Sequence, residues 1–85
     1  MKFRKKPVII EAAQWFPGRE VPGVREQWYK GLPTRYYVVT MHEQRVYLSP
    51  GDWVIAEPDG EHFYPCKPEV FAATYEPVEP ENFPP

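Results

Sequence analysis

Turn signals that recur at short intervals are the feature that most constrains what this 85-residue chain can fold into. The stretch SPGDWVIAEPDGEHFYPCKP, at residues 49–68, contains two of them. Its opening Ser-Pro-Gly-Asp is typical of a type II turn, because proline fixes φ at the second position and glycine supplies a positive φ at the third. The later Pro-Asp-Gly is a strong signal for a tight hairpin. The stretch therefore predicts two short strands joined by turns, and a structural scaffold rather than a reaction centre.

Alternating apolar residues predict strands in two other parts of the chain. Residues 7–15, PVIIEAAQW, are apolar on both faces and predict a central strand, with Glu11 at the rim of the sheet beside a basic residue. Residues 36–48 alternate in two runs separated by His-Glu-Gln. They predict a hairpin in which His42 is exposed at the turn.

Residues 21–31, VPGVREQWYKG, carry the punctuation of a short helix. A proline stands near the expected first turn, and Gly31 stands at the expected C-terminal cap. In such a helix Trp28 would dock onto the sheet, while Glu26 and Lys30 would form an i,i+4 pair on the outside.

A second short helix is expected at residues 68–76, which begin with a proline and precede another. Phe71 and Tyr75 are four residues apart there and would face the sheet together. The pattern as a whole predicts an α+β fold, with a small, mainly antiparallel sheet of four or five strands and two short helices. One compact domain is expected at residues 1–76, followed by a Pro- and Glu-rich tail at residues 77–85.

Charge is distributed unevenly along the chain, although its formal net charge is only −2. Residues 1–50 hold nine of the ten Lys and Arg together with four acids, whereas residues 51–85 hold one Lys and eight acids. The acidic half would repel phosphates, so non-specific nucleic-acid binding is not expected. The opposed ends can pair within one chain or with a second copy, and a homodimer is therefore one expected state.

The cysteine count and the hydropathy of the chain indicate the cellular compartment expected for the protein. A single cysteine cannot form an intramolecular disulfide, which favours a reducing compartment. No run approaches the roughly 20 apolar residues of a membrane span. The basic start is followed by an apolar run too short for a signal peptide, which Glu11 interrupts. We therefore expect an intracellular protein without a membrane partner.

Motifs for catalysis, cofactors and metals are sparse. The five glycines match no phosphate-loop spacing, and the two histidines and one cysteine match no zinc pattern. His62 and Cys66, four residues apart on one expected strand, would lie about 13 Å from each other, too far to share a metal. Cys66 is expected to be a small buried apolar residue. We therefore expect no catalytic residue, no metal site and no cofactor.

The basic run KFRKK and the aromatic residues of the expected sheet are the candidates for binding. The run can hold phosphate, or it can be a solvated arm that precedes a strand; rings beside it can stack on a base. The candidate binding residues are Arg4, Lys5, Lys6, Tyr36, Tyr47, Trp53, Tyr64 and Lys67.

Three stretches also follow a recurring layout. The chain opens with FRKKPVIIEAAQW at residues 3–15, has PGDW at residues 50–53, and closes with FYPCKPEVFAATYEPV at residues 63–78. This order resembles the PGDYG-type family of small phage and prophage proteins, whose hallmark is a Pro-Gly-Asp-aromatic turn; here Trp53 stands where the family name has tyrosine. Residues 16–48 fall in the family's variable part. The resemblance implies a phage gene product in the host bacterial cytoplasm, and it implies no activity and no catalytic residue.

These observations leave three functional interpretations open. The first is a non-enzymatic phage accessory protein that binds a host or phage macromolecule, above all a protein, and inhibits host machinery or defence. The second is an oligomeric protein that sequesters a nucleotide with the basic arm and the sheet tyrosines. The third is a small hydrolase in which carboxylates such as Glu11, Asp52 and Glu61 converge.

Overall fold

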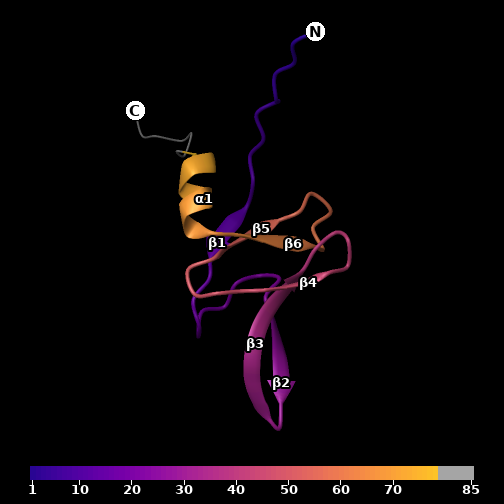
Figure 1. Cartoon of the computed structure of the whole chain (residues 1–85), viewed down its shortest axis with the longest axis vertical. Coiled ribbons are helices and arrows are strands. Elements are labelled where there is room, and N and C mark those ends of the chain that lie inside the picture. The colour runs from indigo at the N-terminus through magenta and orange to yellow at the C-terminus, as the bar shows by residue number, and fades with distance from the viewer. Residues whose placement is uncertain (79–85) are drawn as a thin grey trace, which may run out of the picture.

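The computed structural model describes residues 1–78, and within them the chain forms six strands and one helix (Figure 1). The elements are β1 (Ala12–Gln14), β2 (Arg25–Tyr29), β3 (Leu32–Val39), β4 (Arg45–Tyr47), β5 (Trp53–Ala56), β6 (Phe63–Cys66) and α1 (Pro68–Thr74). The strands form two three-stranded antiparallel sheets, with the orders β1-β5-β6 and β2-β3-β4. The protein is therefore mostly sheet, and the expected α+β fold with two helices is wrong.

The segment at residues 21–31, expected to be a helix, contains strand β2 instead. Lys30 and Gly31 both have positive φ, at 51° and 80°, which is the conformation of a two-residue hairpin turn. The glycine interpreted as a helix cap therefore turns the chain from β2 into β3. Trp28 does not dock onto the sheet and is exposed. The expected i,i+4 pair of Glu26 with Lys30 is wrong as well, because Glu26 lies in β2 and Lys30 in the turn that follows it.

The first strand is shorter than expected, and it lies at an edge of its sheet rather than in the centre. Its pairing with β5 ends where the Ala56 N–H donates to the Glu11 carbonyl at 3.0 Å. The Pro-Asp-Gly turn follows β5, so the residues before Glu11 pair with no strand of residues 1–78. Val8 and Ile9 are consequently exposed. Glu11 is exposed too, and within residues 1–78 it forms no ion pair.

The two predicted hairpins and the C-terminal helix are confirmed. β3 and β4 pair across a turn in which His42 is exposed, and β5 and β6 pair across the Pro-Asp-Gly turn. The type II turn is formed as well, since Gly51 has a φ of 94° and the Asp52 N–H donates to the Ser49 carbonyl at 3.0 Å. The greater part of the tail expected at residues 77–85 lies outside the described residues.

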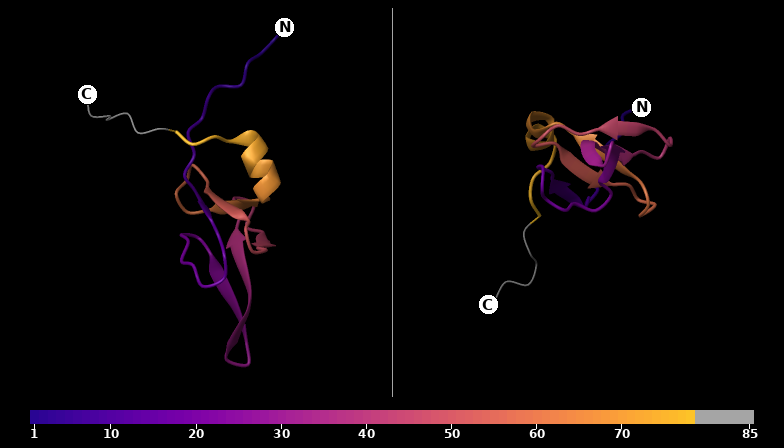
Figure 2. Two further views of the ribbon diagram at one scale, coloured as in Figure 1. Left: turned by 90° about the vertical axis from the view of Figure 1, so that its left-hand side faces the viewer. Right: turned by 90° about the horizontal axis from the view of Figure 1, so that it is seen from below.

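The core lies between the facing sides of the two sheets. Trp15, which follows β1, packs there with Val38 of β3 and Val54 of β5, and each of them is at most 3% exposed. Burial of each such side chain contributes about 1.5–3 kcal/mol. Helix α1 covers the other side of the β1-β5-β6 sheet, where the rings of Trp53 and Phe71 stack with centroids 4.0 Å apart. The order of layers is helix, first sheet, second sheet (Figure 2).

The β2–β3 hairpin extends away from these layers at the end of the molecule opposite α1 (Figure 1). We call its far end the hairpin tip and define it by Trp28, Tyr29 and Leu32. These side chains are 58%, 63% and 67% exposed, respectively. The tip therefore presents large apolar side chains to solvent at the part of the fold farthest from the helix.

The loop before β2 packs closely on the first sheet at Gly23 but not at Gly18. Gly18 and Gly23 have nearly equal φ, 87° and 89°, but a Cβ at Gly23 would overlap the ring of Phe63, whereas a Cβ at Gly18 would meet nothing within 4 Å. Gly18→Ala is expected to cost about 1–2 kcal/mol through its φ alone. Gly23→Ala is expected to cost a further 1–3 kcal/mol or so, because the ring must move.

Urea unfolding of both glycine variants measures the difference. Equal free energies of unfolding for the two variants would show that the loop does not pack against Phe63.

Candidate functional site

The side of the β2-β3-β4 sheet that faces away from the core carries arginines and tyrosines. Side chains alternate between the faces of a strand, so the register shows which residues share this side. Arg25, Tyr37 and Tyr47 lie directly opposite one another on the three strands. We call this surface the Arg–Tyr face, and it consists of Arg25, Gln27, Arg35, Tyr37, Val39, Arg45 and Tyr47. It contains three arginines and no acidic residue.

Two of these arginines lie over the two tyrosine rings. The Arg35 guanidinium carbon is 3.4 Å from the centroid of the Tyr47 ring, and that of Arg45 is 4.6 Å from the centroid of the Tyr37 ring. The rings pack edge to face with centroids 5.9 Å apart, and the Tyr47 hydroxyl donates to Gln27 Oε1 at 2.7 Å. Each cation–π contact at an exposed site contributes about 0.5–1 kcal/mol. The tyrosines therefore hold both guanidinium groups in place above the sheet.

One end of the Arg–Tyr face opens into a pocket of about 570 Å³ between the turns of the two sheets. The pocket is lined by Arg25, Tyr37, Val39, Glu43, Arg45, Glu61 and His62. It combines the positive charge of the face with two carboxylates contributed by the turns.

His62 connects the two turns at this pocket. Its Nε2 lies 2.9 Å from Glu43 Oε1 in the β3–β4 turn, and its Nδ1 contacts Asp59 in the β5–β6 turn. The hydrogen bond to Asp59, and then that to Glu43, raises the pKa of His62 above its ordinary value. The backbone N–H groups of Glu61 and His62 donate to Asp59 at 2.8 and 2.9 Å, and these bonds lower the pKa of that carboxyl to about 2. The carboxylates of Asp59 and Glu43 therefore favour the protonated, positively charged form of the His62 imidazole.

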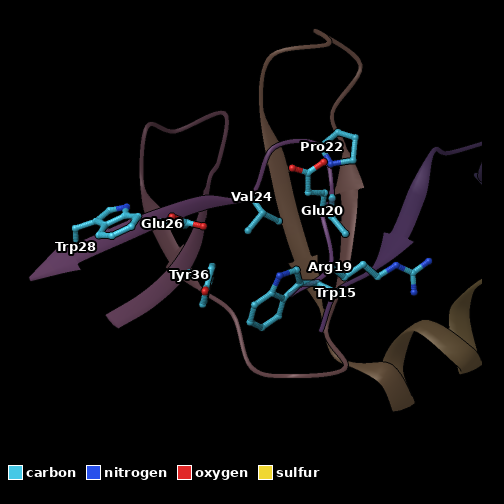
Figure 3. A pocket seen from close by; sticks show the side chains of 9 residues that line it. Trp15, Arg19, Glu20, Pro22, Val24, Glu26, Trp28 and Tyr36 are labelled. Carbon is cyan, nitrogen blue, oxygen red and sulfur yellow. The ribbon is translucent and has the colours of Figure 1, made fainter. Parts of the chain in front are cut away.

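A groove of about 740 Å³ lies on the opposite side of the same sheet, between the loop before β2 and the β2–β3 hairpin (Figure 3). Trp15 forms one end of this Trp groove, with its ring centroid 5.0 Å from that of Tyr36. Trp28 forms the other end, near the hairpin tip (Figure 3). Charges of both signs border the groove, from Arg19, Glu20 and Glu26. It can therefore accept a mixed apolar and polar segment.

The Pro-Gly-Asp turn links the first sheet to α1. Asp52 is 2% exposed, and its carboxylate accepts the Ser49 N–H at 2.9 Å and the Lys67 ammonium at 3.2 Å. Its backbone carbonyl accepts the Trp15 N–H at 2.8 Å. Lys67 is thus a structural partner of a buried carboxylate, at the residue that precedes α1.

The structure does not bring the sequence-predicted binding residues together. Arg4, Lys5 and Lys6 are exposed in the N-terminal segment, which runs away from both sheets (Figure 1). Trp53 and Tyr64 lie on the α1 side of the first sheet, where Trp53 stacks on the helix. Of the remaining candidates, Tyr36 lies in the Trp groove and Tyr47 on the Arg–Tyr face. The proposed combination of basic arm and stacking rings therefore has no single surface.

Burial affects the pKa values of two side chains of β6, Tyr64 and Cys66. Burial, followed by the hydrogen bond with Tyr75, raises the pKa of the Tyr64 hydroxyl above its ordinary value. Burial raises the pKa of the Cys66 thiol as well, and Asp52 and Glu69 add to this effect. A thiol with a raised pKa holds little thiolate at neutral pH. The half-buried Cys66 therefore suits packing better than nucleophilic attack.

Sequence reasoning missed the three arginines of the Arg–Tyr face. A signal was present, because Arg35 and Tyr37 are two residues apart, as are Arg45 and Tyr47, and residues two apart in a strand share a face. Arg25 could not be joined to them because its segment was interpreted as a helix.

Residues 1–78 contain neither a metal-binding cluster nor a membrane-spanning helix. No group of three or more His, Cys, Asp or Glu side chains there could hold a metal ion. No helix in the same residues is long and apolar enough to cross a bilayer.

Comparison of the chain with protein-family models, with curated proteins and with solved structures gave no match. The resemblance to the PGDYG-type family therefore stays a prediction that rests on the motifs at residues 3–15, 50–53 and 63–78.

His62 provides a test of the contact between the two turns. We expect its imidazole to titrate above about 6.5, the ordinary value for histidine. Because the pKa is higher in the folded than in the unfolded state, the stabilisation is fully present below the unfolded value and is lost as the pH rises through the folded pKa. NMR titration of the ring protons measures this pKa.

Two variants isolate the partners of His62. Glu43→Gln and Asp59→Asn should each lower the pKa of His62, because each removes one negative charge beside the ring. A His62 pKa that neither substitution changes would contradict the described contact.

Proposed function

We propose that the protein is a binding protein that contacts a protein partner through the hairpin tip and the adjoining Trp groove, and that it is not an enzyme. The observation that carries this proposal is the exposure of Trp28, Tyr29 and Leu32 together at the end of a projecting hairpin. Clustered apolar side chains on the surface of a small protein mark interaction sites. Trp and Tyr are also the residue types that contribute most binding energy at interfaces.

The geometry of β2 provides a second means of contact. β2 is the outer strand of its sheet, so one side of its backbone faces no neighbouring strand of residues 1–78. An extended segment of a partner can pair with such an edge. The Trp groove begins beside the same strand and offers a concave surface for the partner's side chains. A partner that pairs one of its strands with β2 would then be placed to insert a side chain into the adjacent Trp groove.

The charges around the groove favour a protein partner. Arg19, Glu20 and Glu26 line the groove, so a partner with both charges and apolar side chains is complementary to it. The resemblance to a phage family supports a partner in a bacterial cytoplasm, whose host machinery or defence the protein would inhibit. The hairpin falls within residues 16–48, the variable part in that resemblance.

The hydrolase interpretation has little geometric support. Asp52 is buried, and both of its carboxylate oxygens accept from Lys67, which leaves it unavailable to a substrate. Glu11 and Glu61 are exposed on separate segments.

Capture from a host bacterial lysate, followed by measurement with the purified partner, tests the proposal. Trp28→Ala should weaken binding by about 2 kcal/mol or more, as expected for an aromatic anchor. It should change the free energy of unfolding by only about 0.5 kcal/mol, because the side chain is largely exposed. Val70→Ala, at an exposed apolar residue of α1, is the matched control and should leave affinity unchanged.

Two results would contradict the proposal. One is a captured partner that binds Trp28→Ala and Leu32→Ala as tightly as the original chain. The other is a partner whose affinity Val70→Ala reduces as much as Trp28→Ala does.

A further inference from the structure

We propose that the Arg–Tyr face is an anion site that binds a compact polyphosphate, such as the diphosphate or triphosphate group of a nucleotide. This site lies on the side of the β2-β3-β4 sheet opposite the Trp groove. It therefore does not depend on the protein-binding function proposed above.

Three arginines lie in or beside one row of the sheet. Arg25 stands in that row, directly opposite Tyr37, which in turn stands opposite Tyr47. Arg35 comes from the row on one side and lies over Tyr47, 3.4 Å from its ring centroid. Arg45 comes from the row on the other side and lies over Tyr37, 4.6 Å from its ring centroid. Two positive charges therefore lie over two neighbouring rings, and Arg25 adds a third charged residue beside them in the same row.

The supporting contacts fix Arg35 and Arg45 before a ligand binds. Tyr37 is buried and Tyr47 is half-buried, so neither ring is free to move with its arginine. The hydrogen bond from Tyr47 to Gln27 further fixes the ring beneath Arg35. Guanidinium groups donate paired hydrogen bonds to phosphate, and a group held in advance loses less entropy on binding. Within residues 1–78 none of the three arginines forms an ion pair.

The surroundings favour a compact ligand over an extended nucleic-acid strand. The pocket at the end of the face has a volume of about 570 Å³, within the range of roughly 300–1,000 Å³ typical of small-molecule sites. Glu43 and Glu61 border it and would repel phosphates that continue past the arginines. His62 contacts Glu43 and offsets part of that charge. The rings are covered by arginines, so the site recognises the phosphates and leaves the base unspecified.

Isothermal titration calorimetry at low ionic strength, with inorganic pyrophosphate and ADP as probes, tests the inference. Both should bind with one site per chain, and Arg25→Gln, Arg35→Gln and Arg45→Gln should each weaken binding by about tenfold, the loss of one charge-assisted contact. Arg45→Lys should bind less tightly than the original chain but more tightly than Arg45→Gln, because lysine keeps the charge without the fork. Arg19→Gln, at the Trp groove, is the matched control.

Amide NMR spectra show whether each variant is folded and where the probe binds. Shifts should concentrate on residues 25–27, 35–39 and 45–47. The inference is overturned if neither probe binds, if Arg19→Gln weakens binding as much as the other variants, or if the shifts fall elsewhere. Tighter binding of a single-stranded oligonucleotide or of an acidic peptide than of pyrophosphate would also overturn it.

Discussion

The buried carboxylate of Asp52 is the interaction on which the rest of the structure depends. It closes its own turn by accepting the Ser49 N–H and accepts the Lys67 ammonium at the start of α1, while its backbone carbonyl accepts the N–H of Trp15. A buried carboxylate is costly unless such partners satisfy it. The Gly51 N–H donates in turn to the Trp15 carbonyl at 2.8 Å. One turn thereby fixes β1, β5, the helix and the central tryptophan.

This arrangement leaves the β2-β3-β4 sheet free for binding. That sheet contributes Val38 to the core through one face, while the arginines of its other face and its projecting hairpin are exposed. Binding residues are commonly carried by mobile or projecting segments on a rigid support. The two proposed sites occupy opposite sides of one sheet, so a polyphosphate at Arg35 and a protein at Trp28 need not exclude each other.

Local signals were sufficient to predict the Pro-Gly-Asp and Pro-Asp-Gly turns, the hairpins at residues 36–48 and 49–68, and the C-terminal helix. They failed where pairing with another strand, rather than the local sequence, determines the structure of a segment. Lys30-Gly31 resembles a helix end in sequence, but pairing of β2 with β3 makes it a hairpin turn. The apolar run before Glu11 resembles a strand, but within residues 1–78 no strand pairs with it. The Arg–Tyr face depends on the register of three strands, which no single segment specifies.

Native-state hydrogen exchange measures the central role of the Pro-Gly-Asp turn most directly. If the turn holds the two sheets and the helix together, the N–H groups of Trp15 and Gly51, both buried residues, should exchange only when the whole chain unfolds. Their exchange free energies should equal the free energy of unfolding, and both should fall together in Asp52→Ala. Exchange of these two amides as fast as that of Glu43, in the exposed β3–β4 turn, would contradict the account.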